Sequence, residues 1–304
     1  MQYSWSEYWQ NEGVTGECFV DKTGKKHPQI TAFWQQHIDV AKGRRLLDLA
    51  SGAGSIFVDN PSLEGCELIA LDYSEIALQQ LINKIPSCFA IKASASQLPF
   101  KYNTFDQIVS QFGVEYAGVE AIPNAYRYLK PGGKLAFLCH IRDGFVDTRN
   151  QIELEGALLC QSLQFVQAAK DVVSALYDVD ATNIDSSMQV FREIEPKFAS
   201  FATKHQFGVL FHLYSGFRQL ITNRQKYYLQ DILKWLDGMN GEIAKTQQRL
   251  HEIISVALNT QQVENIAEEL LSQGAENILI KEFLLEGHDK PVAWHICARK
   301  PEDS

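Results

Sequence analysis

The chain has 304 residues, 45% of them hydrophobic, with a formal net charge of −9 and a pI of about 5.4. This length can bury one large core, or a core with a subdomain. The acidic balance argues against nucleic acid and against anionic membrane surfaces as partners. No apolar stretch approaches the roughly 20 residues that cross a bilayer, so no membrane span is expected.

The six cysteines and eight histidines are scattered along the chain. Neither a C-x-x-C pair nor an H-E-x-x-H spacing occurs among them, and such spacings are the usual signs of zinc sites and disulfide frameworks. No metal site is therefore expected.

The N-terminal stretch is rich in aromatic side chains, namely Tyr3, Trp5, Tyr8 and Trp9. It has neither the basic start nor the apolar centre of a secretory signal, so a cytoplasmic location is expected. We predict that residues 1–30 form an N-terminal cap segment. The alternative is a helix packed on the core through these rings.

Residues 46–55, LLDLASGAGS, predict a buried strand that runs directly into a glycine loop. Gly52 and Gly54 allow positive φ and a close approach of a ligand to the backbone. Ligands of open α/β sheets bind beyond the carboxyl ends of the strands, so a nucleotide-type cofactor is expected here. A dinucleotide fingerprint needs a third glycine where Phe57 stands. The loop alone does not identify the cofactor. It is also compatible with an ordinary strand–turn–helix that binds no cofactor.

Residues 67–72, ELIALD, predict a second strand that ends in Asp72. A carboxylate at this position suits the two hydroxyls of a ribose, because both of its oxygens accept hydrogen bonds. Ser74 is expected to cap a helix that begins at Glu75. The alternative for Asp72 is a solvated turn residue.

Two further blocks follow in chain order. Residues 94–100 read SASQLPF and are followed by NTFDQIVSQF at 103–112, which predicts a turn and a fourth strand. Residues 128–135 read YLKPGGKL, a Pro-Gly-Gly turn that leads into a fifth strand from Lys134 to Cys139. The alternation of strands and helices up to this point implies a parallel sheet.

The remainder of the chain changes in character. Between 145 and 258 apolar residues recur at three- and four-residue spacing, which predicts a large helical insertion after the fifth strand. Residues 263–272 predict a helix ending at Gly274. Two runs, 277–285 and 292–298, then predict a hairpin of strands.

In this order and spacing, the glycine loop, the acidic end of the second strand, the L-P-F block and the L-K-P-G-G turn resemble class I S-adenosylmethionine (SAM) methyltransferases. The resemblance covers roughly residues 30–141 and the last strands, and it is strongest to the small-molecule branch similar to ubiquinone/menaquinone-type methyltransferases. It implies a doubly wound, seven-stranded, mostly parallel α/β sheet (Rossmann-like) with an antiparallel last strand. Plain NAD-binding domains do not usually close with such a hairpin.

The resemblance also implies a domain organisation and a reaction. A SAM-binding core spans 31–144, the insertion spans 145–258, and 259–304 complete the sheet. The implied reaction transfers the methyl group of SAM to a small, apolar or aromatic acceptor and leaves S-adenosylhomocysteine (SAH). The insertion is interpreted as a substrate cap, and a structural or dimerising subdomain that forms a homodimer is the alternative.

The implied cofactor-binding residues come from the ends of four strands. They are Asp48, Ala50, Ser51, Gly52, Gly54, Asp72, Tyr73, Ser94, Ala95, Ser96, Ser110, Gln111 and Phe112. Ser94 departs from the family, which often has Asp there to bond the adenine amine. Serine accepts a hydrogen bond without charge, so the adenine contacts are the least specific part of this set.

Three residues are candidates for handling the acceptor: Glu115, Tyr116 and His140. Glu115 and Tyr116 could orient or deprotonate an acceptor, and an imidazole such as His140 can serve as a base. Glu115 could instead be a helix N-terminal acid, and His140 a structural histidine. Two other functions stay open, a non-catalytic SAM-binding or assembly protein and a nucleotide-cofactor oxidoreductase.

Overall fold

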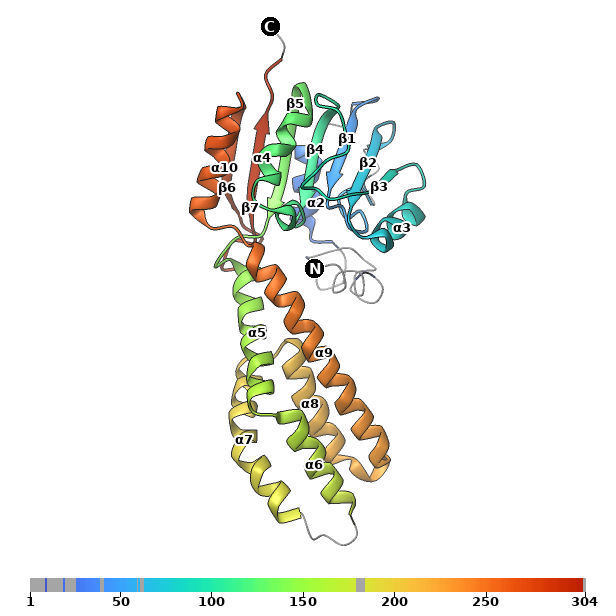
Figure 1. Ribbon diagram of the computed structural model, residues 1–304, viewed down its shortest axis with the longest axis vertical. Coiled ribbons are helices and arrows are strands. Elements are labelled where there is room, and N and C mark those ends of the chain that lie inside the picture. Colours follow the sequence, from blue (N-terminus) through green and yellow to red (C-terminus); the bar gives the residue numbers. More distant parts are fainter. Residues whose placement is uncertain are drawn as a thin grey trace. The chain divides into compact units, whose positions relative to one another are not determined.

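The computed structural model describes Trp9, Phe19 and residues 26–38, 41–58, 60, 63–178 and 184–302 (Figure 1). Most of the cap segment predicted at 1–30, including Tyr3, Trp5 and Tyr8, lies outside the described residues. Within the described part of the chain, no helix combines the length and apolar character needed to cross a bilayer.

The chain divides into two compact units. The first comprises Met1–Asp147 together with Ser255–Ser304, and the second comprises Thr148–Ile254. The second unit lies within the limits predicted for the insertion, 145 and 258. Ala257 and Leu258 belong to the first unit because they are buried there and the Leu258 amide donates to the carbonyl of His140.

The first unit is built on a seven-stranded sheet with the strand order β3-β2-β1-β4-β5-β7-β6. The strands are β1 Arg45–Leu49, β2 Glu67–Asp72, β3 Phe89–Lys92, β4 Phe105–Gln111, β5 Leu129–Cys139, β6 Glu276–Phe283 and β7 Ala293–Arg299. All neighbouring pairs are parallel except those of β7, which runs antiparallel to β5 and β6. The predicted fold class is confirmed.

The fifth strand begins earlier than predicted, at Leu129 and not at Lys134. Leu129 already pairs with Phe105, and the ladder then shifts register before Lys134 pairs with Gln107. Gly132 takes a φ of 76° in between. The Pro-Gly-Gly turn is therefore an irregularity inside the strand, and it bends the strand without ending it.

Helices cover both faces of this sheet. They are α2 Pro28–His37, α3 Glu75–Lys84, α4 Ala121–Ala125 and α10 Thr260–Ser272, with 3-10 turns η2 Val114–Ala117 and η3 Tyr126–Tyr128. Ile108 packs in the core that contains α4 and α10, whereas its neighbour Val109 packs with α2 and α3. This split follows from the alternation of side chains along a strand.

Local capping explains where two of these helices begin and end. The Ser74 hydroxyl accepts from the Ala77 amide at 3.3 Å, which confirms the predicted N-cap of α3. At the end of α10, the Gly274 amide donates to Leu271 and the Ala275 amide to Leu270, a Schellman motif. Gly274 takes a φ of 82° there, which glycine adopts at low cost.

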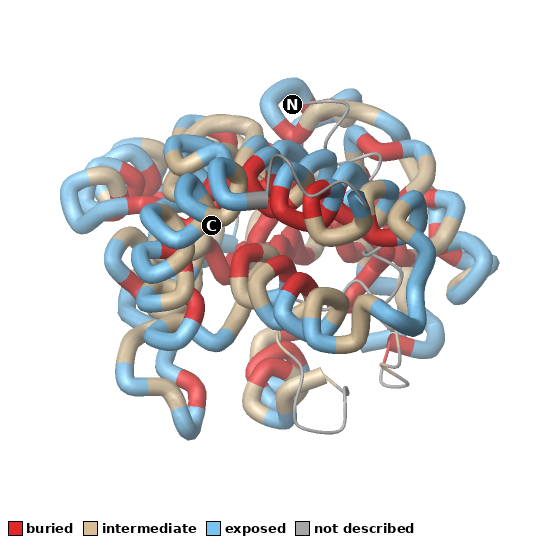
Figure 2. The backbone as a smooth tube through the Cα atoms, turned by 90° about the horizontal axis from the view of Figure 1, so that it is seen from below, coloured by how far each residue is buried: buried red, intermediate tan, exposed pale blue. Residues whose placement is uncertain are grey.

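The second unit is helical, as predicted. It contains most of α5 Phe145–Ser162 and α9 Leu229–Val256, and all of α6 Phe165–Tyr177, α7 Ile184–Lys204, α8 Gly208–Thr222 and the 3-10 turn η4 Arg224–Lys226. Phe165 and Phe198 stack at its centre with ring centroids 3.7 Å apart. Buried and exposed residues alternate along its helices, as expected for amphipathic segments that share one core (Figure 2).

Candidate functional site

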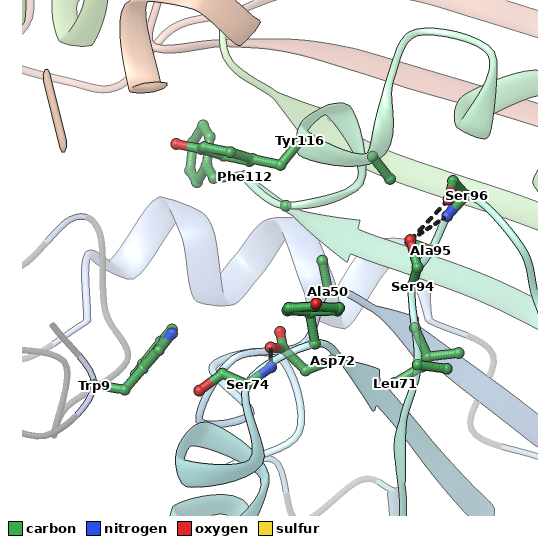
Figure 3. Close-up of a pocket in the computed structure, with 14 residues that line it drawn as sticks. Trp9, Ala50, Leu71, Asp72, Ser74, Ser94, Ala95, Ser96, Phe112 and Tyr116 are labelled. Carbon is green, nitrogen blue, oxygen red and sulfur yellow. Dashed lines mark hydrogen bonds between the residues drawn. The ribbon is translucent and has the colours of Figure 1, made fainter. Parts of the chain in front are cut away.

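A cavity of about 490 Å³ opens in the first unit at the carboxyl ends of β1, β2, β3 and β4. This volume falls within the usual range of small-molecule sites, roughly 300–1,000 Å³. Its described lining residues are Trp9, Ala50, Leu71, Asp72, Tyr73, Ser74, Ala93, Ser94, Ala95, Ser96, Phe112, Gly113, Tyr116 and Ala117 (Figure 3). The cavity lies where the predicted cofactor site was expected.

Asp72 connects the end of β2 to the glycine loop. One carboxylate oxygen accepts from the Gly52 amide at 2.8 Å and the other from the Ser74 amide at 2.7 Å. Burial raises the pKa of Asp72, and the amides of Ser74 and Gly52 oppose this rise. Each carboxylate oxygen has a second lone pair, so Asp72 can still accept hydrogen bonds from a bound diol.

The glycine loop adopts backbone conformations that most residues avoid. Ala50, Gly52 and Gly54 have φ values of 52°, 53° and 83°. Ala50 is thus held in the left-handed region without being glycine, a conformation that costs free energy and is concentrated at functional sites. The ring of Trp9 covers Gly52 so closely that an added Cβ would lie 2.5 Å from it.

Gly113 is a site residue that the sequence interpretation missed. A Cβ at this position would lie 2.6 Å from the carbonyl oxygen of Ala50 and 2.7 Å from its Cβ. The segment after β4 can therefore approach the loop after β1 only because residue 113 has no side chain. A glycine two residues after the end of a buried strand was the available signal.

We expect Gly113→Ala to open this contact and to destabilise the first unit by about 1–3 kcal/mol, as overpacking typically does. SAH binding, measured by calorimetry, should weaken at the same time. The matched control is Gly238→Ala in α9, where an added Cβ meets nothing within 4 Å. That substitution should raise the free energy of unfolding by about 0.5–1 kcal/mol. Equal effects of the two substitutions would contradict the steric argument.

Several predicted cofactor residues are not among the described residues that line the cavity. These are Asp48, Ser51, Gly52, Gly54, Ser110 and Gln111. The Ser110 hydroxyl donates to the Leu49 carbonyl at 2.7 Å and accepts from the Val114 amide at 3.0 Å. The Gln111 side chain accepts from the indole of Trp34 and donates to Ser55. Both side chains join the strand ends that support the cavity, and a role for the two residues in cofactor binding stays a prediction.

Asp48 is a buried carboxyl group behind the glycine loop. It is 1% exposed, and neither of its oxygens has a hydrogen-bond partner among the described residues. Burial first, and then the charge of Asp72, raise its pKa well above the ordinary value, while Lys26 opposes the rise. Keeping this carboxylate charged therefore costs folding free energy.

Asp48→Asn should for this reason stabilise the fold in a pH-dependent way. Because the folded-state pKa of Asp48 is raised, its contribution to stability is full below the ordinary carboxyl pKa and is lost as the pH rises through the folded pKa. Urea unfolding should be measured between about pH 5 and about pH 8. As the pH rises, the free energy of unfolding of the variant should increase relative to that of the wild type by on the order of 1 kcal/mol.

Asp106 provides a control of opposite sign. Burial alone would raise its pKa, but hydrogen bonds from the Arg45 amide, Lys130 and Arg44 outweigh this effect and lower it. Asp106→Asn should then lose stability near neutral pH, and the loss should shrink as the pH falls through the folded pKa. A parallel response of Asp48→Asn and Asp106→Asn would overturn both assignments.

Glu115 and His140 form a buried pair beside the cavity. Glu115 lies in η2 and is 3% exposed, and its Oε1 lies 2.7 Å from His140 Nδ1 and 2.8 Å from the His140 amide nitrogen. Glu115 is also the acidic residue in the first turn of η2, so the alternative role as a helix N-terminal acid stays open beside its pairing with His140. With Nδ1–H directed at the carboxylate, Nε2 of His140 is left as an acceptor.

Two aromatic rings connect this pair to the cavity. The ring of His140 lies 4.9 Å from that of Phe112 and 5.8 Å from that of Tyr116, between centroids. Phe112 and Tyr116 themselves line the cavity, and Figure 3 shows both rings on its wall. The three acceptor-handling candidates are thus brought together, although Glu115 and His140 are not among the described lining residues.

The sheet order, the antiparallel β7 and a cavity above the glycine loop with an acidic residue at the end of β2 define a Rossmann-like methyltransferase unit. A family model described as a methyltransferase domain matches residues 47–137, from β1 into β5. The chain therefore carries a class I SAM-dependent methyltransferase domain, and SAM is the cofactor of this class.

Curated relatives include several methyltransferases. An uncharacterized methyltransferase of Schizosaccharomyces pombe is 32% identical over 120 residues, which is 39% of this chain and 48% of that protein. A ubiquinone/menaquinone biosynthesis C-methyltransferase of Yersinia pestis is 35% identical over 150 residues, covering 42% and 60%. A demethylmenaquinone methyltransferase of Renibacterium salmoninarum is 33% identical over 101 residues, covering 32% and 42%.

Each match covers only part of this chain and part of the relative. The chain spans only 42% to 60% of the length of these relatives. Among solved structures, a SAM-dependent methyltransferase from Aquifex aeolicus is 22% identical and covers 37% of this chain and 66% of that chain, with a TM-score of 0.32.

Proposed function

We propose that this protein transfers the methyl group of SAM to an apolar or aromatic small-molecule acceptor. The observation that carries the proposal is the position of Asp72, which ends β2, lines the cavity and orders the glycine loop through two backbone amides. This arrangement supports the binding of a ligand that presents a vicinal diol beside the loop.

The residues of the cavity fit such a cofactor. When bound, SAM supplies a methyl group that its sulfonium already activates for transfer. Asp72 would hold the ribose hydroxyls, and Ser94 to Ser96 would face the adenine. The hydroxyls of Ser94 and Ser96 lie 2.7 Å apart and bond to each other (Figure 3). This uncharged pair stands where the family often has a carboxylate, so hydrogen bonding at the adenine would depend on neutral partners.

The Glu115–His140 pair would act on the acceptor. A phenolic or similarly acidic group must lose a proton as it attacks a methyl carbon, and a base in reach accelerates that step. His140 Nε2 would take the proton, and the Glu115 carboxylate would stabilise the imidazolium across the 2.7 Å contact to Nδ1. Phe112 and Tyr116 would hold an aromatic acceptor against the cavity wall, since both rings lie there.

Two relatives support an aromatic acceptor by their names, which refer to demethylmenaquinone and to ubiquinone and menaquinone biosynthesis. For this chain the acceptor, the atom methylated, the helical unit's role as a substrate cap and a homodimer through it stay proposals. The same holds for a cytoplasmic location and for the expectation that no nucleic acid is bound.

The test uses the purified full chain. Calorimetry should show SAM and SAH binding in the micromolar range, and NADH fluorescence titration should show none. Methyl-labelled SAM with a panel of phenols and reduced quinones should then yield labelled product. No binding of either SAM or SAH would end the proposal, and NADH binding in their place would favour the oxidoreductase alternative.

A non-catalytic SAM-binding protein is the second candidate, because the uncharged Ser94–Ser96 pair departs from the pattern of the family. It would bind SAH normally and transfer no methyl group to any member of a broad panel. Comparison of binding with turnover in the same preparation separates these two functions.

A further inference from the structure

Three potential metal ligands converge on the face of the sheet that carries α2. His37 is the last residue of α2, and His295 and Cys297 lie two residues apart on β7, so both point to the same face. One donor atom from each residue lies within 4.8 Å of the other two. The sequence interpretation expected no metal site, because the cysteines and histidines show no metal-ligand spacing along the chain.

We propose that His37, His295 and Cys297 bind a transition-metal ion, with Zn²⁺ as the preferred occupant. Two imidazoles and one thiolate are a typical donor set for zinc. Mg²⁺ and Ca²⁺ prefer oxygen ligands and would bind weakly to this donor set. Three protein ligands would leave a fourth position for water. This site is separate from the cavity residues and does not rest on the proposed function.

The outer contacts of His37 suit a metal ligand. Its Nδ1 lies 2.8 Å from the backbone carbonyl of Phe33, one turn earlier in α2. A hydrogen bond from Nδ1–H to that carbonyl makes Nε2 the lone-pair nitrogen and holds the ring in place. Metal-bound histidines commonly donate their second nitrogen to a carbonyl or carboxylate in this way.

Aromatic rings enclose the cluster. Phe33 stacks on His37 with centroids 4.2 Å apart and meets His295 edge-on at 4.7 Å, and Phe283 packs against Phe33 at 5.2 Å. His295 is 2% exposed. An apolar shell of this kind limits water access and strengthens the bonds of a bound ion.

The geometry requires a small adjustment. His295 Nε2 and Cys297 Sγ lie 2.8 Å apart, in contact with each other. Zn–N and Zn–S bonds of about 2.0 and 2.3 Å place such atoms roughly 3.5 Å apart in a tetrahedron. To admit the ion, the His295 and Cys297 donor atoms would move apart and the His37 donor, which lies within 4.8 Å of them, would approach to about 3.5 Å. The Cys297 thiol would lose its proton to solvent as the Zn–S bond forms, without any change of oxidation state.

Two nearby ammonium groups oppose the ion, because Lys134 and Lys281 both act electrostatically on Cys297. Lys281 is the cross-strand partner of His295, so both side chains lie on the same face. Its ammonium group would repel a divalent cation, and its removal should tighten binding. This gives a variant whose effect has the opposite sign from that of a ligand variant.

An occupied site would join two parts of the first unit. It would link the end of α2 to the closing strand β7, and α2 also bears Trp34, whose indole donates to Gln111 at the end of β4. Binding to the folded chain would raise the melting temperature in proportion to the logarithm of free metal.

The test is a Co²⁺ and Zn²⁺ titration of the chelator-treated full chain. Co²⁺ should bind as a single equivalent with the thiolate-to-cobalt absorption of a four-coordinate sulfur site, and Zn²⁺ should displace it. Cys297→Ser should abolish that absorption, and His37→Gln should weaken Zn²⁺ binding at least as much as the roughly 10–100-fold that loss of an outer partner costs. Lys281→Gln should tighten binding a few-fold.

Cys66→Ser is the matched control, because Cys66 is a partly buried cysteine outside the cluster. It should leave the titration unchanged. Thermal unfolding of each variant without metal establishes that it folds, so that loss of binding is not loss of structure. Absence of the sulfur absorption in the wild type, or its persistence in Cys297→Ser, would overturn the proposal and leave a simple hydrogen bond between His295 and Cys297.

Discussion

Asp72→Ala should weaken the binding of SAM and SAH by about 100-fold or more. Hydrogen bonds to a charged group contribute roughly 1.5–3 kcal/mol each, and a ribose would make two to this carboxylate. In the wild type, the Asp72 carboxylate accepts hydrogen bonds from the amides of Gly52 and Ser74 at 2.8 and 2.7 Å. The substitution removes both of these bonds. The glycine loop would then lose part of its order before the ligand arrives.

Two further variants separate these effects. Asp72→Asn keeps one oxygen acceptor and the shape of the side chain but not its charge, so it should bind SAH with an intermediate affinity. Glu75→Gln changes an exposed carboxylate three residues further on, which pairs with Lys92. The SAH affinity of Glu75→Gln should lie within about twofold of the wild-type affinity, because exposed ion pairs contribute little. Calorimetry that shows full affinity in Asp72→Ala would refute the assignment of the ribose site.

His140→Ala should lower kcat by about 10²–10⁴-fold, the usual contribution of a positioned base, while SAH affinity changes little. The expectation rests on the contact between His140 Nδ1 and Glu115 at 2.7 Å, which leaves Nε2 free to accept a proton. Glu115→Gln should retain the shape of the pair and give a smaller loss, since an amide orients the imidazole without stabilising its charge. Both are measured by turnover with labelled SAM.

A structural role for His140 would give a different pattern. Added imidazole should restore part of the turnover of His140→Ala if the missing group is a base, and it should not rescue a distorted site. Tyr116→Phe keeps the ring on the cavity wall, so a large loss in that variant would move the base to the tyrosine hydroxyl. Full turnover in His140→Ala would remove the base from the mechanism.

The sequence predicted several of the residues that line the cavity, because the signals for them are local. A buried strand followed by glycines, and an acidic residue at the end of the next strand, both lie on single elements whose carboxyl ends meet at one edge of a parallel sheet. Ala50, Asp72 and Ser94 were accordingly placed on the cavity. Ser110 and Gln111 were identified from the same strand end, but their side chains hold neighbouring backbone and side chains together.

The remaining features depend on pairs that are distant along the chain. Gly113 matters because Ala50 lies against it, and Glu115 matters because its carboxylate meets His140. The His37–His295–Cys297 cluster joins residues near the two ends of the described chain. Nothing in the spacing of these residues indicated that they would meet.

By itself, then, the sequence determined the sheet, the closing hairpin, the helical insertion and the acidic residue at the end of β2, because hydrophobic periodicity and turn chemistry act over a few residues. Only the tertiary structure decided which side chains face one another. The approach of the loops after β1 and β4, the buried Glu115–His140 pair and the metal-ligand cluster all arise from packing of separate elements on the sheet. Such contacts follow from the three-dimensional register of the strands, which a linear pattern does not contain.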